Sequence, residues 1–275
     1  MLRNGNKWDR RIERARELAG RYAFATEILT FYAKLAAFQQ AFQVSLESDP
    51  RAVPASARDG HLLPELGRPE FELLMPRWRP FLSFLAREGT PALAGFANSL
   101  QRSEDNECAQ LLMQFWPGGA RERSDEDLSR FAALAFLQPY AEYLAARADA
   151  APPVARRPVC PFCGSKPVVG VLRPEGDGAK RSLVCSFCYR EWDYLRIACP
   201  ACEESRDERM GVYVASQFEH VRVETCEACG RYIKTVDLTK NGLAVPEVDE
   251  LAAIPLTLWA DDKGYAKLSR NLFGS

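Results

Sequence analysis

Residues 160–164 read CPFCG, residues 185–202 read CSFCYREWDYLRIACPAC, and residues 226–230 read CEACG. These stretches hold eight of the nine cysteines of the 275-residue chain, arranged as four CxxC pairs. Two intervening residues let both thiolates of a tight turn point at one ion, and two such turns supply the four sulfurs of a tetrahedral metal site. The spacing therefore predicts metal-binding modules in the second half of the chain.

The four pairs form an internal repeat. The first two pairs are separated by 21 residues and the last two by 23, and equivalent cysteines lie 39 or 41 positions apart. Two groupings are open: consecutive pairs that form one site each, or an interleaved arrangement that mixes the first pair with the third. We favour the consecutive grouping because each half contains a complete set. The predicted metal ligands are Cys160, Cys163, Cys185 and Cys188 for one site, and Cys199, Cys202, Cys226 and Cys229 for the other.

The residues that follow the pairs favour rubredoxin-like knuckles. Gly164 and Gly230 come directly after two of the pairs and permit a left-handed turn there. Tyr189 and Glu203 stand at the corresponding places of the other two pairs, where such a turn is less relaxed. The ligand set fits either iron, in two rubredoxin-like Fe–S4 sites, or zinc. An inert ion that only folds the ribbons is the common case for such modules.

The remaining composition is that of an ordinary globular chain, with 47% hydrophobic residues and a formal net charge of −1. No apolar region follows the basic residues of the first eleven positions, so we expect no secretory signal. No apolar run approaches the roughly 20 residues of a membrane helix. We therefore expect a cytoplasmic protein without membrane insertion, whose thiols stay reduced and available to metals. The ninth cysteine, Cys108, is predicted to be a plain buried thiol.

The two halves of the chain differ in their residue pattern. From about residue 8 to residue 150, apolar residues recur three or four positions apart, which indicates helices. One helical face is formed by Phe24, Ile28, Phe31, Tyr32, Leu35, Phe38 and Phe42. Beyond that half, short β-rich runs stand next to the cysteine pairs, at 168–172, 181–184, 211–215 and 221–224.

The expected fold class is therefore α+β, with a helical N-terminal domain, two tandem rubredoxin-like or zinc-ribbon modules and a C-terminal tail. A small, proline-rich and basic stretch, ADAAPPVARRP at 148–158, marks the boundary between the halves. The tail is expected to pack back on the modules or on the helical domain, with a short helix around residues 249–253. The expected division is a helical domain at 1–150, a linker at 151–158, modules at 159–196 and 197–242, and the tail at 243–275.

No residue set for catalysis is visible. The chain has no Gly-rich phosphate loop, Ser/His/Asp arrangement or HExxH helix, and neither His61 nor His220 has ligand spacing to a cysteine pair. Residues 159–240 hold 12 basic and 12 acidic side chains, whereas a module that binds phosphates should be clearly basic. We therefore expect neither an enzyme nor a nucleic-acid partner. A nucleic-acid-binding zinc ribbon and a rubredoxin-like electron carrier are the alternatives.

The order of these motifs resembles a known family. A helical first half, then CPFCG, CSFCYREWDYLRIACPAC and CEACGRYIKTVDL, and finally VPEVDELAAIPLTLWADDKGY at 245–265, is similar to the FdhE-type formate dehydrogenase accessory proteins. The resemblance covers most of the chain. Its specific parts are the four CxxC pairs, the link that contains Trp192, and the tail motif that begins at Asp249 and Glu250.

The resemblance implies a cytoplasmic, rubredoxin-like, iron-binding protein. It implies a chaperone-like accessory role, in which the protein binds the catalytic subunit of a formate dehydrogenase and is needed for that enzyme to become active. It also implies that the chain is not itself an enzyme, and that the eight cysteines are metal ligands or determinants of partner binding.

Overall fold

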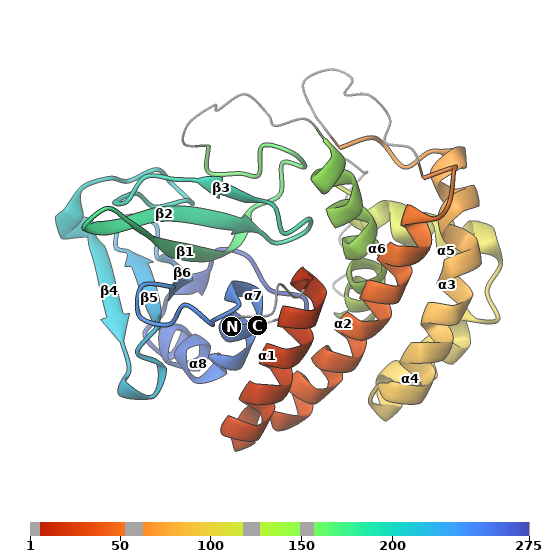
Figure 1. Ribbon diagram of the computed structural model, residues 1–275, viewed down its shortest axis with the longest axis horizontal. Helices are drawn as coiled ribbons and strands as arrows, with labels where there is room; N and C mark the ends of the chain where they lie inside the picture. The colour runs from red at the N-terminus through yellow and green to blue at the C-terminus, as the bar shows by residue number, and fades with distance from the viewer. Residues whose placement is uncertain (1–5, 53–62, 118–126, 149–156, 275) are drawn as a thin grey trace.

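The first half of the protein is helical, as expected (Figure 1). The computed structural model describes residues 6–52, 63–117, 127–148 and 157–274. The linker expected at 151–158 lies mostly outside these residues, and so does His61. The helices of this half are α1 (Lys7–Arg21), α2 (Thr26–Glu47), α3 (Arg68–Glu88), α4 (Pro91–Leu100), α5 (Asp105–Phe115) and α6 (Asp127–Arg147).

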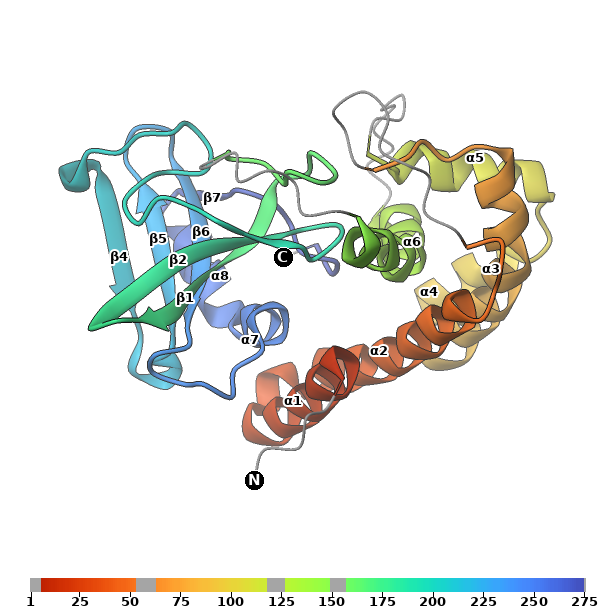
Figure 2. The same cartoon turned by 45° about the horizontal axis from the view of Figure 1, so that its top comes forward.

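Helix α2 forms over most of the stretch that the helical periodicity predicts, but Phe24 of the expected face lies in a 3-10 turn (Ala23–Ala25) before the helix and is 49% exposed. Leu29, Tyr32, Leu35 and Phe42 are buried on one of its sides, because residues three and four apart share a helix face. Helix α6 is buried around most of its circumference and lies in the centre of the helical half (Figure 2). Cys108 on α5 is fully buried, which confirms its prediction as a plain core thiol.

The second half is built on one mixed sheet of seven strands, in the order β3-β2-β1-β6-β5-β4 with β7 beside β6. The first cysteine module contributes an antiparallel unit of three strands, and the second contributes another. Parallel pairing of β1 with β6 joins the two units edge to edge. The strands are β1 (Pro167–Glu175), β2 (Gly178–Cys185), β3 (Glu191–Asp193), β4 (Met210–Val214), β5 (Val221–Cys226), β6 (Arg231–Asp237) and β7 (Ala266–Lys267).

The C-terminal segment returns to the middle of the molecule. It forms α7 (Pro246–Ala252), α8 (Ile254–Asp262) and the short strand β7. Helix α7 lies against β1 and β6 on one side and against α1 on the other (Figures 1 and 2). It therefore stands between the sheet and the first helix of the chain.

Two hydrophobic cores connect the helical half with the cysteine half. One core contains side chains of α2, α3, α5 and α6 together with the cysteines and aromatic residues of the first cluster. The other contains side chains of α1 and α2 together with the sheet, α7 and α8. The fold class is α+β, as the sequence predicts. Among the described residues, no helix is both long and apolar enough to cross a bilayer.

Candidate metal centres

The eight paired cysteines form two four-sulfur clusters in the consecutive grouping. The sulfurs of Cys160, Cys163, Cys185 and Cys188 all lie within 4.8 Å of one another, and so do those of Cys199, Cys202, Cys226 and Cys229. Individual Sγ–Sγ distances include 3.7 Å for Cys160 and Cys188 and 3.6 Å for Cys199 and Cys229. Four sulfurs about 2.3 Å from a central ion lie about 3.8 Å apart in a tetrahedron. Both clusters therefore have dimensions that fit one ion each.

Every knuckle turns through a left-handed residue directly after its second cysteine. The φ angles are 72° at Gly164, 49° at Tyr189, 61° at Glu203 and 63° at Gly230. Such a turn brings the following backbone N–H back to the first cysteine of the knuckle, as at Gly164, whose N–H donates to the Cys160 carbonyl at 2.9 Å. Each cluster thus has one glycine knuckle and one knuckle strained by a side chain at positive φ.

The first cluster is enclosed between the sheet and the helical half. All four of its cysteines are buried. Residues far away in the sequence bind both knuckles: the Leu63 N–H donates to the Phe162 carbonyl at 3.1 Å, and Gln138 Nε2 donates to the Ser186 carbonyl at 3.2 Å. The Trp116 ring contacts the Phe187 ring edge-on, with 5.4 Å between the centroids.

The second cluster lies at the surface. Cys199 and Cys226 are buried, but Cys202 is exposed and Cys229 is half-buried. The C-terminal segment contacts the knuckle of Cys226 and Cys229, because the Ala266 N–H donates to the Gly230 carbonyl at 2.8 Å. The two clusters therefore share one ligand set and differ in what surrounds them.

Burial makes one thiol of each cluster resist ionisation. It raises the pKa of the Cys185 thiol well above its usual range, and it raises the pKa of Cys199 as well. Backbone N–H groups point at these two sulfurs, from Phe187 to Cys185 and from Ala201 to Cys199, each at 3.3 Å. A bound cation would supply the charge that stabilises four thiolates at such a place. The donor set and its surroundings therefore suit a metal ion.

A buried ion pair joins the two cysteine modules. Arg181 on β2 lies 2.6 Å from Glu224 on β5, and both side chains are almost completely buried. The same guanidinium donates to the carbonyls of Leu195 and Ala198, at 2.9 and 3.0 Å. Arg181 thereby fixes the link between the modules, which brings Cys199 to its cluster.

Sequence reasoning did not find the buried polar groups around α7. His220, which has no ligand spacing to cysteine, contacts Asp249 with 2.7 Å between Nε2 and Oδ1. Lys234 is completely buried and lies 2.9 Å from Glu250. The available signals were the acidic pair at 249–250 and a lysine inside the apolar run of β6.

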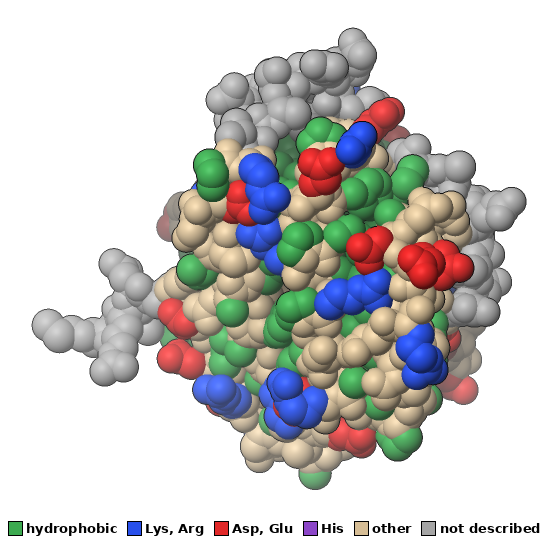
Figure 3. All heavy atoms as spheres, turned by 90° about the vertical axis from the view of Figure 1, so that its right-hand side faces the viewer, with side chains coloured by type: hydrophobic (Ala, Val, Ile, Leu, Met, Phe, Trp, Pro, Cys, Tyr) green, Lys and Arg blue, Asp and Glu red, His purple; other side chains and the backbone are tan. Residues whose placement is uncertain are grey.

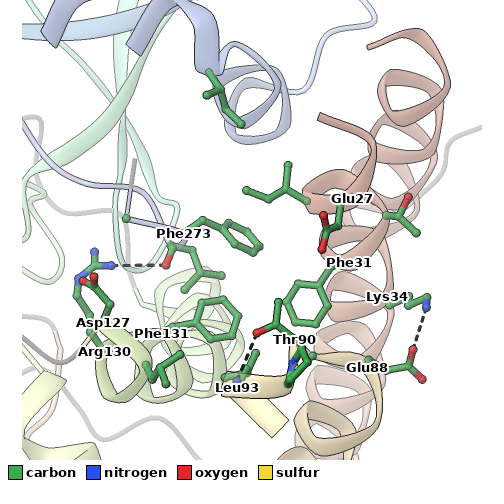
Figure 4. Close-up of a pocket in the computed structure, with 18 of the residues that line it drawn as sticks. Glu27, Phe31, Lys34, Glu88, Thr90, Leu93, Asp127, Arg130, Phe131 and Phe273 are labelled. Carbon is green, nitrogen blue, oxygen red and sulfur yellow. Dashed lines mark hydrogen bonds and ion pairs between the residues drawn. The ribbon is translucent and has the colours of Figure 1, made fainter. Parts of the chain in front are cut away.

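A groove also went unpredicted, at the seam between the halves (Figure 4). This seam groove has a volume of about 820 Å³ and is lined by α2, α6, the start of α4 and the C-terminal segment. Three rings from distant parts of the chain meet in it, because Phe131 lies 6.0 Å from Phe31 and 5.4 Å from Phe273 between centroids. Charged side chains stand at its edge, among them Glu27 and the Lys34–Glu88 ion pair.

Comparison with known proteins identifies relatives of both the sequence and the fold. The family model described as "FdhE, central domain" matches residues 159–196, and the one described as "FdhE, C-terminal domain" matches residues 197–273. The crystal structure of the FdhE protein from Pseudomonas aeruginosa superposes with a TM-score of 0.73 at 26% sequence identity, covering 100% of this chain and 98% of that one.

Curated relatives extend the similarity over nearly the whole sequence. A "Protein FdhE homolog" of Aquifex aeolicus is 28% identical, covering 96% of this chain and 94% of the relative. "Protein FdhE" of Salmonella arizonae is 30% identical, covering 98% of this chain and 88% of the relative. Since this similarity includes the helical half as well as both cysteine modules, the chain belongs to the FdhE family.

Proposed function

We propose that this protein is a cytoplasmic accessory protein that binds the catalytic subunit of a formate dehydrogenase and supports its maturation. The observation that carries the proposal is the pair of four-cysteine clusters within a chain of the FdhE family. The protein acts by binding, with no turnover of formate by itself. Its role is that of a chaperone for another enzyme.

The eight cysteines are proposed as the metal ligands. Four sulfurs complete a tetrahedral shell, so an ion in either cluster keeps no open position for an activated water. The sites therefore serve folding, recognition or electron transfer rather than hydrolysis. Iron in rubredoxin-like form is the proposed metal, and zinc is the alternative that the same ligand set accepts.

The surface charge supports a protein partner. The chain has 36 basic and 37 acidic side chains, and the face that the helical half presents carries both signs interspersed among apolar groups (Figure 3). A surface that binds nucleic acid needs a basic patch to replace the counterions of the phosphates. The absence of net positive charge favours the accessory role over a nucleic-acid-binding zinc ribbon.

The seam groove is the proposed contact for an apolar segment of the catalytic subunit. Its aromatic walls offer apolar surface, and Glu27 at its edge is exposed and suits a basic residue beside that segment (Figure 4). Because Phe31 and Phe131 come from the helical half and Phe273 from the C-terminal segment, the groove has this shape only when the halves are docked. A partner bound there would therefore contact both halves at once.

Co-purification tests the proposal. The tagged protein is isolated without oxygen from cells that make a formate dehydrogenase catalytic subunit, once with its metal and once after the metal is stripped. We expect the metal-bound form to retain the subunit. We also expect the accessory protein without the subunit to show no oxidation of formate. Lack of association in both forms, together with salt-sensitive binding to RNA or DNA, would favour the zinc-ribbon alternative instead.

A further inference from the structure

We propose that the two metal sites have different tasks: the first cluster retains its ion and releases it slowly, and the second readily exchanges its ion with thiolate ligands from outside. Entry takes place along the edge between Cys202 and Cys229. This inference rests on the proposed metal ligation, but it does not depend on the identity of the partner.

The two clusters are built alike, so the exposure of their equivalent cysteines can be compared directly. Each has two knuckles, and the second cysteine of each knuckle stands at an equivalent place in the repeat. In the first cluster these second cysteines are Cys163 and Cys188, with exposed fractions of 7% and 2%. In the second cluster they are Cys202, which is exposed, and Cys229, which is half-buried. The two clusters therefore have the same ligands and differ in how far neighbouring residues shield those ligands from solvent.

The helical half supplies the cover of the first cluster. Trp116 lies against Phe187, Gln138 binds the turn at Ser186, and Leu63 binds the turn at Phe162. These contacts occupy the space through which another ligand would approach. No described residue of the helical half takes this place at the second cluster, where the neighbouring Ala201, Glu203, Glu227 and Ala228 are exposed as well.

The chemistry is an exchange of one thiolate for another. The entering sulfur forms a bond to the ion while the bond from Cys202 breaks, so the charge at the site is unchanged and no electron is transferred. Cys229 can leave by the same route, whereas Cys199 and Cys226 are shielded and leave last. Thiolate exchange requires access to the reacting sulfur. Exposure of two of the four ligands therefore makes the second site the place where an ion is lost, regained or passed on.

The test uses the full chain loaded with two equivalents of zinc as a redox-inert ion. Release to the chromogenic chelator 4-(2-pyridylazo)resorcinol is followed in time, and iodoacetamide labelling with mass mapping identifies the sulfurs that become free. We expect one equivalent to leave in a fast phase and the other about tenfold or more slowly. Cys202 and Cys229 should be alkylated during the fast phase, while the four cysteines of the first cluster stay protected.

A variant that uncovers the first cluster provides the matched control. Trp116→Ala removes the ring that lies on Phe187 and should accelerate the slow phase while the fast phase keeps its rate. Release of both ions in a single phase from the natural protein, or earlier labelling of Cys163 and Cys188, would overturn the proposal. Binding of only one equivalent would do so too. Because no partner takes part, a failure of the formate dehydrogenase proposal would not change these measurements.

Discussion

Arg14 on α1 binds Asp249 on α7 through two hydrogen bonds, 3.0 Å from Nε to Oδ2 and 2.6 Å from Nη2 to Oδ1. The two residues are 235 positions apart, and their side chains are only 4% and 1% exposed. Burial acts to raise the pKa of Asp249, but hydrogen bonds from His220 and Arg14 outweigh it and lower that pKa. This pair therefore joins the first helix of the chain to the segment that lies against the sheet.

Asp249→Asn should destabilise the protein strongly. The substitution removes the buried carboxylate that binds Nε and Nη2 of Arg14 and leaves only the exposed Glu17, 2.7 Å from Nη1, as its counterion. Removing one partner of a buried pair costs about 3 to 5 kcal/mol. Urea unfolding of the two proteins measures the loss. Glu72→Gln is the control, because its ion pair with Arg68 is exposed on both sides and should change the stability by less than about 0.5 kcal/mol. Equal effects of the two substitutions would show that the Arg14–Asp249 pair does not hold the halves together.

Glu250 should make the stability depend on acid pH. Burial acts to raise its pKa, but Lys234 and Lys267 outweigh burial and lower the pKa from its ordinary 4.5 to about 2. The unfolded chain then binds more protons between these values, so the stabilisation is complete above about pH 4.5 and is lost as the pH falls toward 2. It amounts to about 3 kcal/mol. Denaturant unfolding of the natural protein and of Glu250→Gln across this range should give a stability difference that shrinks with acid. A stability difference that stays constant with pH would contradict this role of Glu250.

The features that depend on local sequence spacing could mostly be predicted from the sequence. The CxxC pairs predict the two clusters because the distance between ligands in a knuckle is fixed by the turn itself, and α2 follows from its apolar periodicity. Strands β1, β2, β4 and β5 are confirmed at the expected runs. The predicted division into domains stays a prediction, since most of the linker lies outside the described residues.

Long-range arrangement was the part that the sequence did not reveal. Strand β6 pairs with β1 in parallel, and nothing in either strand indicates its neighbour. Helix α8 went unnoticed because Pro255 and the short apolar run around it do not show a helical period. Asp249 of α7 is buried against Arg14, which α1 supplies from the other end of the chain, and Glu250 is buried against Lys234 and Lys267. Such positions depend on tertiary contacts and leave no local pattern.

Glu203→Gly should stabilise the second module. Glu203 has a φ of 61° and an exposed side chain, so glycine removes backbone strain without a loss of packing. The expected gain is about 1 kcal/mol. Gly230→Ala is the matched opposite on the same cluster, because an added Cβ would meet no atom within 4 Å and only the backbone cost at φ 63° remains. Thermal unfolding of the metal-bound proteins should show the two variants shifted in opposite directions, and shifts of the same sign would refute the strain argument.

Filling the seam groove should weaken binding of the catalytic subunit. Thr30 on α2 lines the groove and is exposed, so Thr30→Trp places a large ring in the space proposed for the partner. Val44→Trp is the control, since Val44 is also β-branched, exposed and on α2, but lies outside the groove. We expect a loss of about tenfold or more in affinity for Thr30→Trp, corresponding to about 1.4 kcal/mol, and none for Val44→Trp. Calorimetry with the isolated subunit measures both, and unchanged affinity for Thr30→Trp would move the contact elsewhere.

Removal of ligands from the two clusters should have unequal effects on the fold. The cysteines of the first cluster belong to the same core as Trp78, Phe136 and Tyr140 of the helical half. Cys160→Ser with Cys163→Ser therefore removes an ion from a core that both halves share. The free energy of a structural zinc site is on the order of 10 kcal/mol in small modules, so this double variant should loosen the helices as well as the first module.

The corresponding change in the second cluster should stay local. Cys226→Ser with Cys229→Ser opens a cluster at the surface, whose cysteines are not part of the core that α6 shares with the first cluster. Hydrogen exchange resolved by peptide distinguishes the cases: α6 should lose protection in the first double variant and keep it in the second. Because α6 is the most completely buried helix of the first half, its protection reports the shared core directly. Equal protection of α6 in both variants would show that the first ion does not support the helical half, and that its enclosure serves only to retain the metal.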